Sequence, residues 1–190
     1  GHATTGTLNA AQYNLGIGVD SLKAITSGDN NLCIGYSVGS LITTGSYNTY
    51  VGSGTGQRVS GHNNVGIGTD ALQLNTGGQN TGIGMEAGSR IAAGAYNICM
   101  GKGSGSNITS GDGNIIIGNV DAASATNDAQ LKVSSYDGTT TVNWIAGDSS
   151  GNLTMPAEIA AVSLDISGAI DVDGTTNLDA VDIDGAVQID

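Results

Sequence analysis

A short phrase returns along this sequence at a nearly constant interval. The pattern Asn-x-x-[Ile, Val or Met]-Gly occurs seven times between Asn14 and Gly118, and successive copies start 16 or 17 residues apart. Such regular self-similarity indicates a repeat architecture in which each unit packs against its neighbours in the array. The asparagines that open the seven copies are Asn14, Asn31, Asn48, Asn64, Asn80, Asn97 and Asn114.

Each repeat unit has the length and punctuation of one coil of a β-solenoid. The unit is too short for a pair of helices, and its apolar run has the length of a strand with turn signals on both sides. We therefore expect each coil to contain a strand, a glycine turn, a second short strand and a second glycine turn. Equivalent strands of neighbouring coils would lie about 4.8 Å apart. The sequence thus predicts an all-β, parallel β-solenoid of 16–17-residue coils.

Three recurring positions have predicted structural roles. Glycines recur because tight corners need a positive φ, which costs a residue with a side chain more. The asparagines are expected to form a hydrogen-bonded ladder of side-chain amides from coil to coil. The most consistently apolar position is predicted to face inward and form the core: Ile17, Ile34, Val51, Ile67, Ile83, Met100 and Ile117.

The predicted core is thin. Each coil offers few inward aliphatic side chains, and the chain contains no Phe. A narrow repeat is stabilised only by neighbouring coils and by protection of its ends. We therefore expect the solenoid to pack sideways against copies of itself, as a homotrimer.

The composition of the chain changes on both sides of the repeat. Residues 1–12 are expected to be a remnant of a purification tag, Gly1-His2, and an N-terminal cap. The solenoid is expected over 13–118, and a linker or collar with a β-hairpin over 119–156. In that segment LKVSSY and TTTVNWIA read as strands joined through Asp137-Gly138, and Trp144 is expected to be a packing anchor. Residues 157–190 alternate aliphatic residues with Asp, which predicts a fibrous β shaft.

Charge and cysteine content exclude several classes of function. The formal net charge is −12, and residues 119–190 hold twelve of the acidic residues but only one basic residue, Lys132. Such a surface repels phosphate backbones, so no nucleic-acid partner is expected. No apolar run approaches 18 residues, so no membrane insertion is expected. Cys33 and Cys99 lie four coils apart, about 19 Å, which is too far for a disulfide and predicts free thiols.

The best candidates for a receptor-binding edge are tyrosines in the column before the repeat asparagine. A tyrosine offers a flat apolar face with a polar tip, which suits contact with a glycan. Capping of a corner and contact between chains are the alternative interpretations of the same column. The candidates are Tyr13, Tyr47 and Tyr96.

Evidence for catalysis or a cofactor is weak. We assign Asp70 and Glu86 to different columns of adjacent coils, so a glycosidase-type carboxylate pair is conceivable but lacks support. No nucleophile–base pair is evident, so no enzyme activity and no cofactor are expected. Two Asp-x-Asp-Gly sequences are weak calcium candidates, with solvated acidic side chains as the alternative, because calcium needs six to eight oxygen ligands. These residues are Asp171, Asp173, Asp182 and Asp184.

The repeat also resembles known proteins. The stretches NVGIGTDAL and NTGIGMEAG resemble the head repeat of trimeric autotransporter adhesins, and the longer unit followed by NWIAGDSSGNLTM resembles modules of bacteriophage tail fibres. The Asp-rich segment after residue 163 is similar to stretches of marine phage fibre proteins. The resemblance implies a left-handed β-roll, a three-fold assembly and a virion tail fibre that touches a glycan or protein receptor on the host surface. The alternatives are a trimeric adhesin head on a bacterial surface and, less favoured, a polysaccharide-degrading tailspike.

Overall fold

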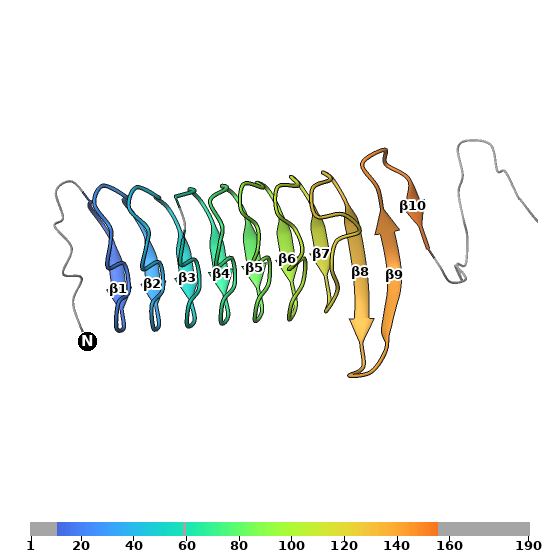
Figure 1. Ribbon diagram of the computed structural model, residues 1–190, viewed down its shortest axis with the longest axis horizontal. Helices are drawn as coiled ribbons and strands as arrows, with labels where there is room; N and C mark the ends of the chain where they lie inside the picture. Colours follow the sequence, from blue (N-terminus) through green and yellow to red (C-terminus); the bar gives the residue numbers. More distant parts are fainter. Residues whose placement is uncertain (1–10, 59, 156–190) are drawn as a thin grey trace, which may run out of the picture. The chain divides into compact units, whose positions relative to one another are not determined.

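A computed structural model describes residues 11–58 and 60–155, which form one ten-stranded sheet with no helix (Figure 1). The strands follow one another in sequence order across the sheet, and neighbours from β1 to β8 pair in parallel, whereas β8, β9 and β10 pair in antiparallel fashion. The predicted parallel β-solenoid is confirmed. The strands are β1 Leu15–Ile17, β2 Leu32–Ile34, β3 Thr49–Val51, β4 Val65–Ile67, β5 Thr81–Ile83, β6 Ile98–Met100, β7 Ile115–Ile117, β8 Leu131–Tyr136, β9 Thr141–Gly147 and β10 Leu153–Thr154.

Each coil contains one strand of three residues, and the second strand that the sequence predicted does not form in the described coils. The return segment consists of turns because two of its residues adopt a left-handed backbone. In the first coil these are Asp20, with φ of 57°, and Leu22, with φ of 50°. A left-handed residue interrupts an extended strand. Backbone bonds still join the coils there, for example from the Leu22 N–H to the Val38 carbonyl at 3.0 Å.

The two glycine columns are needed for different reasons. Glycines that close each strand have positive φ values, 126° at Gly68, and a Cβ there would lie 2.6 Å from the Gly84 carbonyl. The predicted positive φ is confirmed at this corner. The turn glycines, such as Gly61, do not have a positive φ, but a Cβ there would clash with the carbonyl oxygen of Gly77 in the next coil. Stacking distance, rather than backbone conformation, therefore excludes side chains from the second corner.

The predicted core column is wrong for a single chain. Ile17, Ile67 and Met100 are 49 %, 42 % and 40 % exposed, respectively. Side chains alternate across a strand, and it is the middle residue of each three-residue strand that points inward. Cys33, Tyr50, Cys99 and Ile116 occupy this middle position and are buried. The full column that was predicted to be internal but is exposed or half-buried is Ile17, Ile34, Val51, Ile67, Ile83, Met100 and Ile117.

The buried interior is filled from both sides of the coil. Ile25, Ile42, Ile91 and Ile108 project from the return segment and are fully buried. Leu22 and Leu72, also fully buried, belong to coils whose middle strand residue is glycine. Where the strand supplies Cys33, Tyr50 or Cys99 instead, the leucine position is glycine, and a Cβ there would approach that side chain to within 2.9 Å or less. In the coil of β5 both positions are glycine, Gly82 and Gly88, and Leu72 of the preceding coil fills the space: a Cβ at either glycine would lie within 3.0 Å of its side chain.

The solenoid continues beyond Gly118, so the predicted linker boundary is too early. The Gly105 N–H donates to the Val120 carbonyl and the Thr109 N–H to the Ala125 carbonyl, both as in a stacked coil. Gln130 then takes the place of the repeat asparagine. The predicted hairpin at Asp137-Gly138 is present between β8 and β9. Nearly all of the predicted N-terminal cap and the whole shaft over 157–190 lie outside the described residues.

Candidate functional site

The asparagine column forms the predicted ladder, which holds the coils in register. The Asn48 Oδ1 atom accepts from the backbone N–H of Asn64 at 3.0 Å and from its Nδ2 at 3.1 Å. The Asn48 Nδ2 group donates to the Asn31 Oδ1 and to the Gly61 carbonyl. The ladder runs through every predicted member: Asn14, Asn31, Asn48, Asn64, Asn80, Asn97 and Asn114. Gln130 ends it by donating to Asn114 from both its backbone and its amide.

A second ladder, which the sequence interpretation missed, follows the same corner two residues earlier. The side chain of Asp29 accepts from the Gln12 N–H, and the Ser46 hydroxyl accepts from the Asp29 N–H. The His62 Nδ1 accepts from the Ser46 N–H at 3.1 Å. Side chains that can accept a hydrogen bond occupy most positions of this column, and this pattern was the signal in the sequence that could have revealed the second ladder. It gives His62 a structural role.

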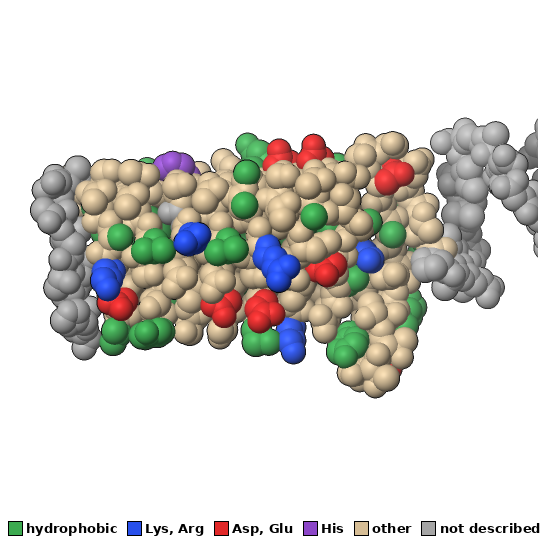
Figure 2. Space-filling view, in the orientation of Figure 1, with side chains coloured by type: hydrophobic (Ala, Val, Ile, Leu, Met, Phe, Trp, Pro, Cys, Tyr) green, Lys and Arg blue, Asp and Glu red, His purple; other side chains and the backbone are tan. Residues whose placement is uncertain are grey.

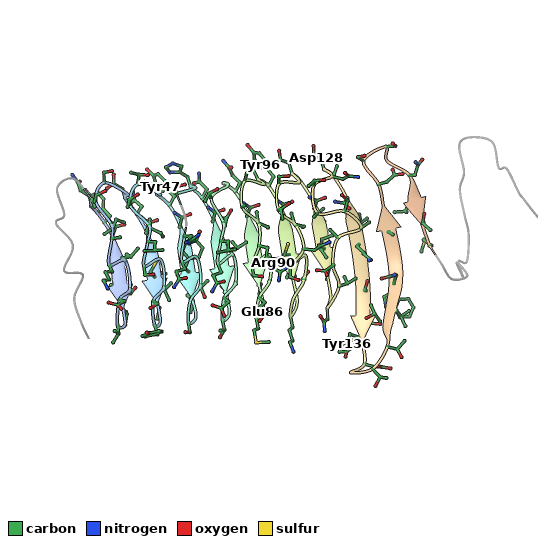
Figure 3. All side chains as sticks on the ribbon, viewed as in Figure 1. Tyr47, Glu86, Arg90, Tyr96, Asp128 and Tyr136 are labelled. Atoms are coloured by element: carbon green, nitrogen blue, oxygen red, sulfur yellow. The ribbon has the colours of Figure 1, made fainter. Side chains whose placement is uncertain are left out.

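The three candidate tyrosines lie exposed at one corner but do not form a joint surface. Tyr13, Tyr47 and Tyr96 are 81 %, 61 % and 63 % exposed. All three have a left-handed φ, between 58° and 61°. They lie two and three coils apart, about 10 and 14 Å, so no two of them contact each other. Figure 3 shows Tyr47 and Tyr96 on one edge, away from Glu86 and Arg90. Their role in receptor contact stays a prediction.

The outer face of the sheet is uncharged and mainly aliphatic along its length. We define this face by the first and third residues of strands β1 to β8, which point away from the interior. None of these residues is charged; all are Leu, Ile, Val, Met or Thr. Many are substantially exposed, from 52 % at Leu15 in β1 to 37 % at Ile117 in β7. Monomeric soluble proteins rarely expose a continuous apolar surface of this kind.

The hairpin extends this outer face. Leu131 and Val133 pair with Ile115 and Ile117, and Ile145 pairs with Val133. Trp144 lies where the register between β8 and β9 shifts, and its Nε1 donates to the Ser135 hydroxyl at 3.0 Å. Ser135 lies two residues after Val133, so the indole is on the same side of the sheet. Trp144 is 53 % exposed, so it is not buried within one chain as a packing anchor would be.

A polar groove lies on the return turns, on the opposite wall from the sheet. It has a volume of about 500 Å³ and crosses the coils that begin at β4, β5, β6 and β7. Its lining includes Asp70, Gln73, Glu86, Arg90, Asn107 and Asp121. Figure 2 shows acidic and basic side chains interspersed on this part of the surface, and Figure 3 shows Glu86 and Arg90 there.

Asp70 and Glu86 occupy the same column, so their assignment to different columns was wrong. Each lies two residues after a corner glycine, Gly68 or Gly84, and each has a left-handed φ, of 55° and 59°. Their equal distance from the corner glycine is visible in the sequence, so that assignment was a misalignment of two repeats. The correction places two carboxylates at the same position of adjacent coils in one groove. Asp70 also accepts a hydrogen bond from the Gln73 amide at 2.8 Å.

The two thiols lie in the interior and are free, as predicted. Burial raises the pKa of Cys33 and of Cys99 to about 12. A thiol is nucleophilic as its thiolate, so neither group is activated at neutral pH. In the part of the chain that the structure describes, no three His, Cys, Asp or Glu side chains are placed to hold a metal ion. The calcium candidates Asp171, Asp173, Asp182 and Asp184 lie outside the described residues.

Comparisons with known proteins do not place the chain in a family. No protein-family model, no curated protein and no solved structure matches it. The likeness to adhesin and tail-fibre repeats therefore stands on the repeat motif itself. Within residues 11–58 and 60–155 there is no helix of the length and apolarity needed to cross a bilayer.

Proposed function

We propose that this chain is a structural and adhesive segment of a homotrimeric fibre, a bacteriophage tail fibre, which presents host-receptor contacts as a stiff rod. The observation that carries the proposal is the uncharged outer face of the sheet. A continuous exposed apolar surface marks a site of protein association. In this solenoid the same apolar positions recur at every coil. A partner that covers them would need contact residues at the same spacing.

A second copy of the same chain matches it best. Copies packed in parallel present their outer faces at the same coil spacing, about 4.8 Å, and the contact repeats coil by coil. Trp144 would close the interface at the hairpin end, since aromatic residues are enriched among the residues that contribute most to interfaces. The number three comes from the resemblance to trimeric adhesin and fibre repeats.

Association through the sheet would leave the tyrosine corner and the polar groove exposed on each copy. Three parallel chains then carry three equivalent sets of weak sites on one rod. Linked weak sites raise the overall avidity because the second and third contacts become intramolecular. Repeated weak contacts would thus allow a thin rod to act as an adhesive element.

The same features fit the head of a trimeric adhesin on a bacterial surface, which is the second candidate. The two candidates differ in the genes around them. Neighbouring virion genes would support the fibre, and a membrane anchor encoded in the same reading frame would support the adhesin.

The mass of the protein in solution tests the assembly. Sedimentation equilibrium or light scattering should give about 56 kDa, three times the chain mass of 18.8 kDa. A mass of 18.8 kDa at micromolar concentration would overturn the homotrimer. The mass of a dimer would be consistent with the outer face as an interface but would overturn the three-fold fibre.

A further inference from the structure

We propose that the polar groove across coils four to seven binds an uncharged, linear saccharide. The inference deepens the proposed function, on which it rests, by naming a ligand class and a place on the chain. It moves the expected ligand site away from the tyrosine corner, whose candidate side chains do not line the groove. The groove instead brings polar groups from four consecutive coils into one cavity.

The shape of the groove suits a ligand that extends along the rod. Asp70, Glu86 and Asp121 line it from the coils that begin at β4, β5 and β7. Three coil intervals correspond to about 14 Å at the spacing of paired strands. A cavity that is long in this direction admits a short stretch of a linear polymer.

The lining offers hydrogen-bond acceptors and donors side by side. The carboxylates of Asp70, Glu86 and Asp121 only accept, whereas the Arg90 guanidinium only donates. Each sugar hydroxyl both donates and accepts, so a chain of hydroxyls can pair with such an alternating lining. Leu74 is 37 % exposed at the edge of the groove and gives an apolar contact for the C–H groups of a ring.

Several lining groups are already fixed by the protein. The Asp121 Oδ1 atom accepts from the Asn107 N–H at 3.1 Å and from the Ser106 hydroxyl at 3.0 Å. The Asn107 amide donates to the Ala122 carbonyl and accepts from the Ala122 N–H. Groups held in place before binding lose less conformational freedom when the ligand arrives.

The charge of the groove selects against acidic ligands. Three carboxylates and one guanidinium line the groove, and the Lys132 ammonium, which donates to the Asp121 carbonyl at 3.1 Å, offsets only part of the excess negative charge. Uronic acids, sulfated sugars and nucleic acids would therefore be disfavoured. A basic peptide is the competing class. Arg90 and the adjacent Lys102, which lines the neighbouring pocket beside Glu86, place positive charge where such a peptide would lie. This interspersed charge favours the neutral saccharide.

A binding assay on the whole protein tests the groove. We would titrate it with neutral hexose and N-acetylhexosamine tetramers of α and β linkage, with their uronic-acid counterparts and with tetralysine, using saturation-transfer NMR and calorimetry. At least one neutral tetramer should bind. Asp70→Asn and Arg90→Gln should each weaken that binding about tenfold or more, because each removes a charge-assisted hydrogen bond.

Coil one supplies the matched controls. Asp20 occupies the same column as Asp70, has the same left-handed backbone and lies outside the groove. Asp20→Asn should therefore leave binding unchanged, and so should Lys23→Gln, which removes the ammonium 3.4 Å from the Asp20 carboxylate, also outside the groove. Circular dichroism and sedimentation on each variant check that the fold and the mass are retained.

Each outcome decides between the proposals. A retained trimer that binds no neutral tetramer overturns the groove and leaves the assembly intact. A monomer that binds a neutral tetramer, with loss on Asp70→Asn, supports the groove and overturns the trimer. Preferential binding of tetralysine or of a uronic-acid tetramer, or neutral binding that survives both groove variants, overturns the saccharide site.

Discussion

At the scale of single residues, the hydrogen bonds of the asparagine side chain explain why the motif Asn-x-x-[Ile, Val or Met]-Gly recurs along the chain. Its side chain has one acceptor and two donor hydrogens, which is what a buried corner between coils needs. The Asn48 side chain contacts the coil before it, the coil after it and the turn beside it through Asn31, Asn64 and Gly61. No other side chain of this size combines these bonds, and a buried polar group left without them is costly.

Replacing Asn48 with Ala should therefore destabilise the solenoid. The change leaves the buried N–H of Asn64 without its acceptor, and we expect the free energy of unfolding to fall by about 3 kcal/mol. Urea denaturation followed by far-UV circular dichroism measures the shift. Asn127→Ala, at an exposed position, is the control and should have little effect. An Asn48 variant as stable as the control would show that the ladder contributes little.

Gly68 should be sensitive to a single methyl group. Its φ of 126° disfavours any side chain, and a Cβ would lie 2.6 Å from the backbone of Gly84. Gly68→Ala should lower the free energy of unfolding by more than 4 kcal/mol, because backbone must move in two coils. Gly138→Ala separates the two effects: its φ is 101° but no atom lies within 4 Å of the added Cβ. We expect a loss of about 1 kcal/mol there, and equal losses would refute the steric explanation.

The buried thiols should make stability fall in alkaline solution. The pKa of Cys33 and Cys99 is raised from 9.0 to about 12 by burial, so the folded protein holds these protons more tightly than the unfolded chain. Their contribution is complete below pH 9 and is lost as the pH rises from 9 towards 12. Burial also raises the pKa of Tyr50 well above its usual value, which acts in the same direction.

The urea midpoint should therefore be flat between pH 7 and about 9 and then decline. The decline should be shallower in the Cys33→Ala, Cys99→Ala double variant, even though that variant is less stable at neutral pH through loss of buried volume. Parallel pH profiles for the two proteins would show that the thiols do not titrate with unfolding.

At the scale of the element, the coil is the unit of construction, and its interior is balanced locally. Tyr50 fills space that glycines leave in two places: a Cβ at Gly56 or at Gly66 would approach its ring to within 2.7 Å. Its hydroxyl donates to the Asn48 Oδ1 atom at 3.4 Å. Asn75 is the one polar residue in a column otherwise filled by Ile and Val. Its Oδ1 atom accepts from the Asn80 Nδ2 at 3.1 Å, whereas its own Nδ2 is buried without a hydrogen-bond partner.

Removal of one whole coil should leave a folded protein. Deleting residues 65–80 joins Asn64 to Thr81, which keeps the ladder in register and brings Gly82 to the position of Gly66 beside Tyr50. We expect a strand signal in circular dichroism and a modestly lower urea midpoint, since one set of neighbour contacts is lost. Deleting 65–72 shifts the register by half a coil and should abolish the fold. If both deletions fold equally well, the coil is not the unit.

At the scale of the whole molecule, the outer face decides whether the solenoid is a lone chain or part of an assembly. Ile67→Asp places a charge in the centre of that face, where Ile67 is 42 % exposed in a single chain. We expect each chain to remain folded but the mass to fall from about 56 kDa towards 18.8 kDa, because the charge would be buried without a partner in the interface.

Ala93→Asp, at an exposed position outside the outer face, is the control and should keep the assembled mass. Loss of strand signal in the Ile67 variant would mean instead that this residue supports its own coil. An unchanged mass would show that association uses another surface.

The sequence by itself determined the repeat, the direction of stacking and the ladder. The reason is that Asn and Gly are demanded locally, by corner hydrogen bonds and by close approach of the backbone, so their period is visible in one dimension. It also placed the hairpin, since Asp-Gly between two strand-like runs is a local signal.

Only the tertiary structure decided which way each side chain faces. A strand of three residues is too short for its alternation to show in the sequence, so the consistently apolar column from Ile17 to Ile117 was assigned to the interior although it lies outside. Glycine, cysteine and tyrosine at the middle position of the strand differ widely in size and hydropathy, because the facing return segment or a neighbouring coil fills the space that each leaves. The groove also needed the tertiary structure: Asp70 and Glu86 share a column that the repeat shows, but only the stacked coils place Arg90 and Asp121 in the same cavity.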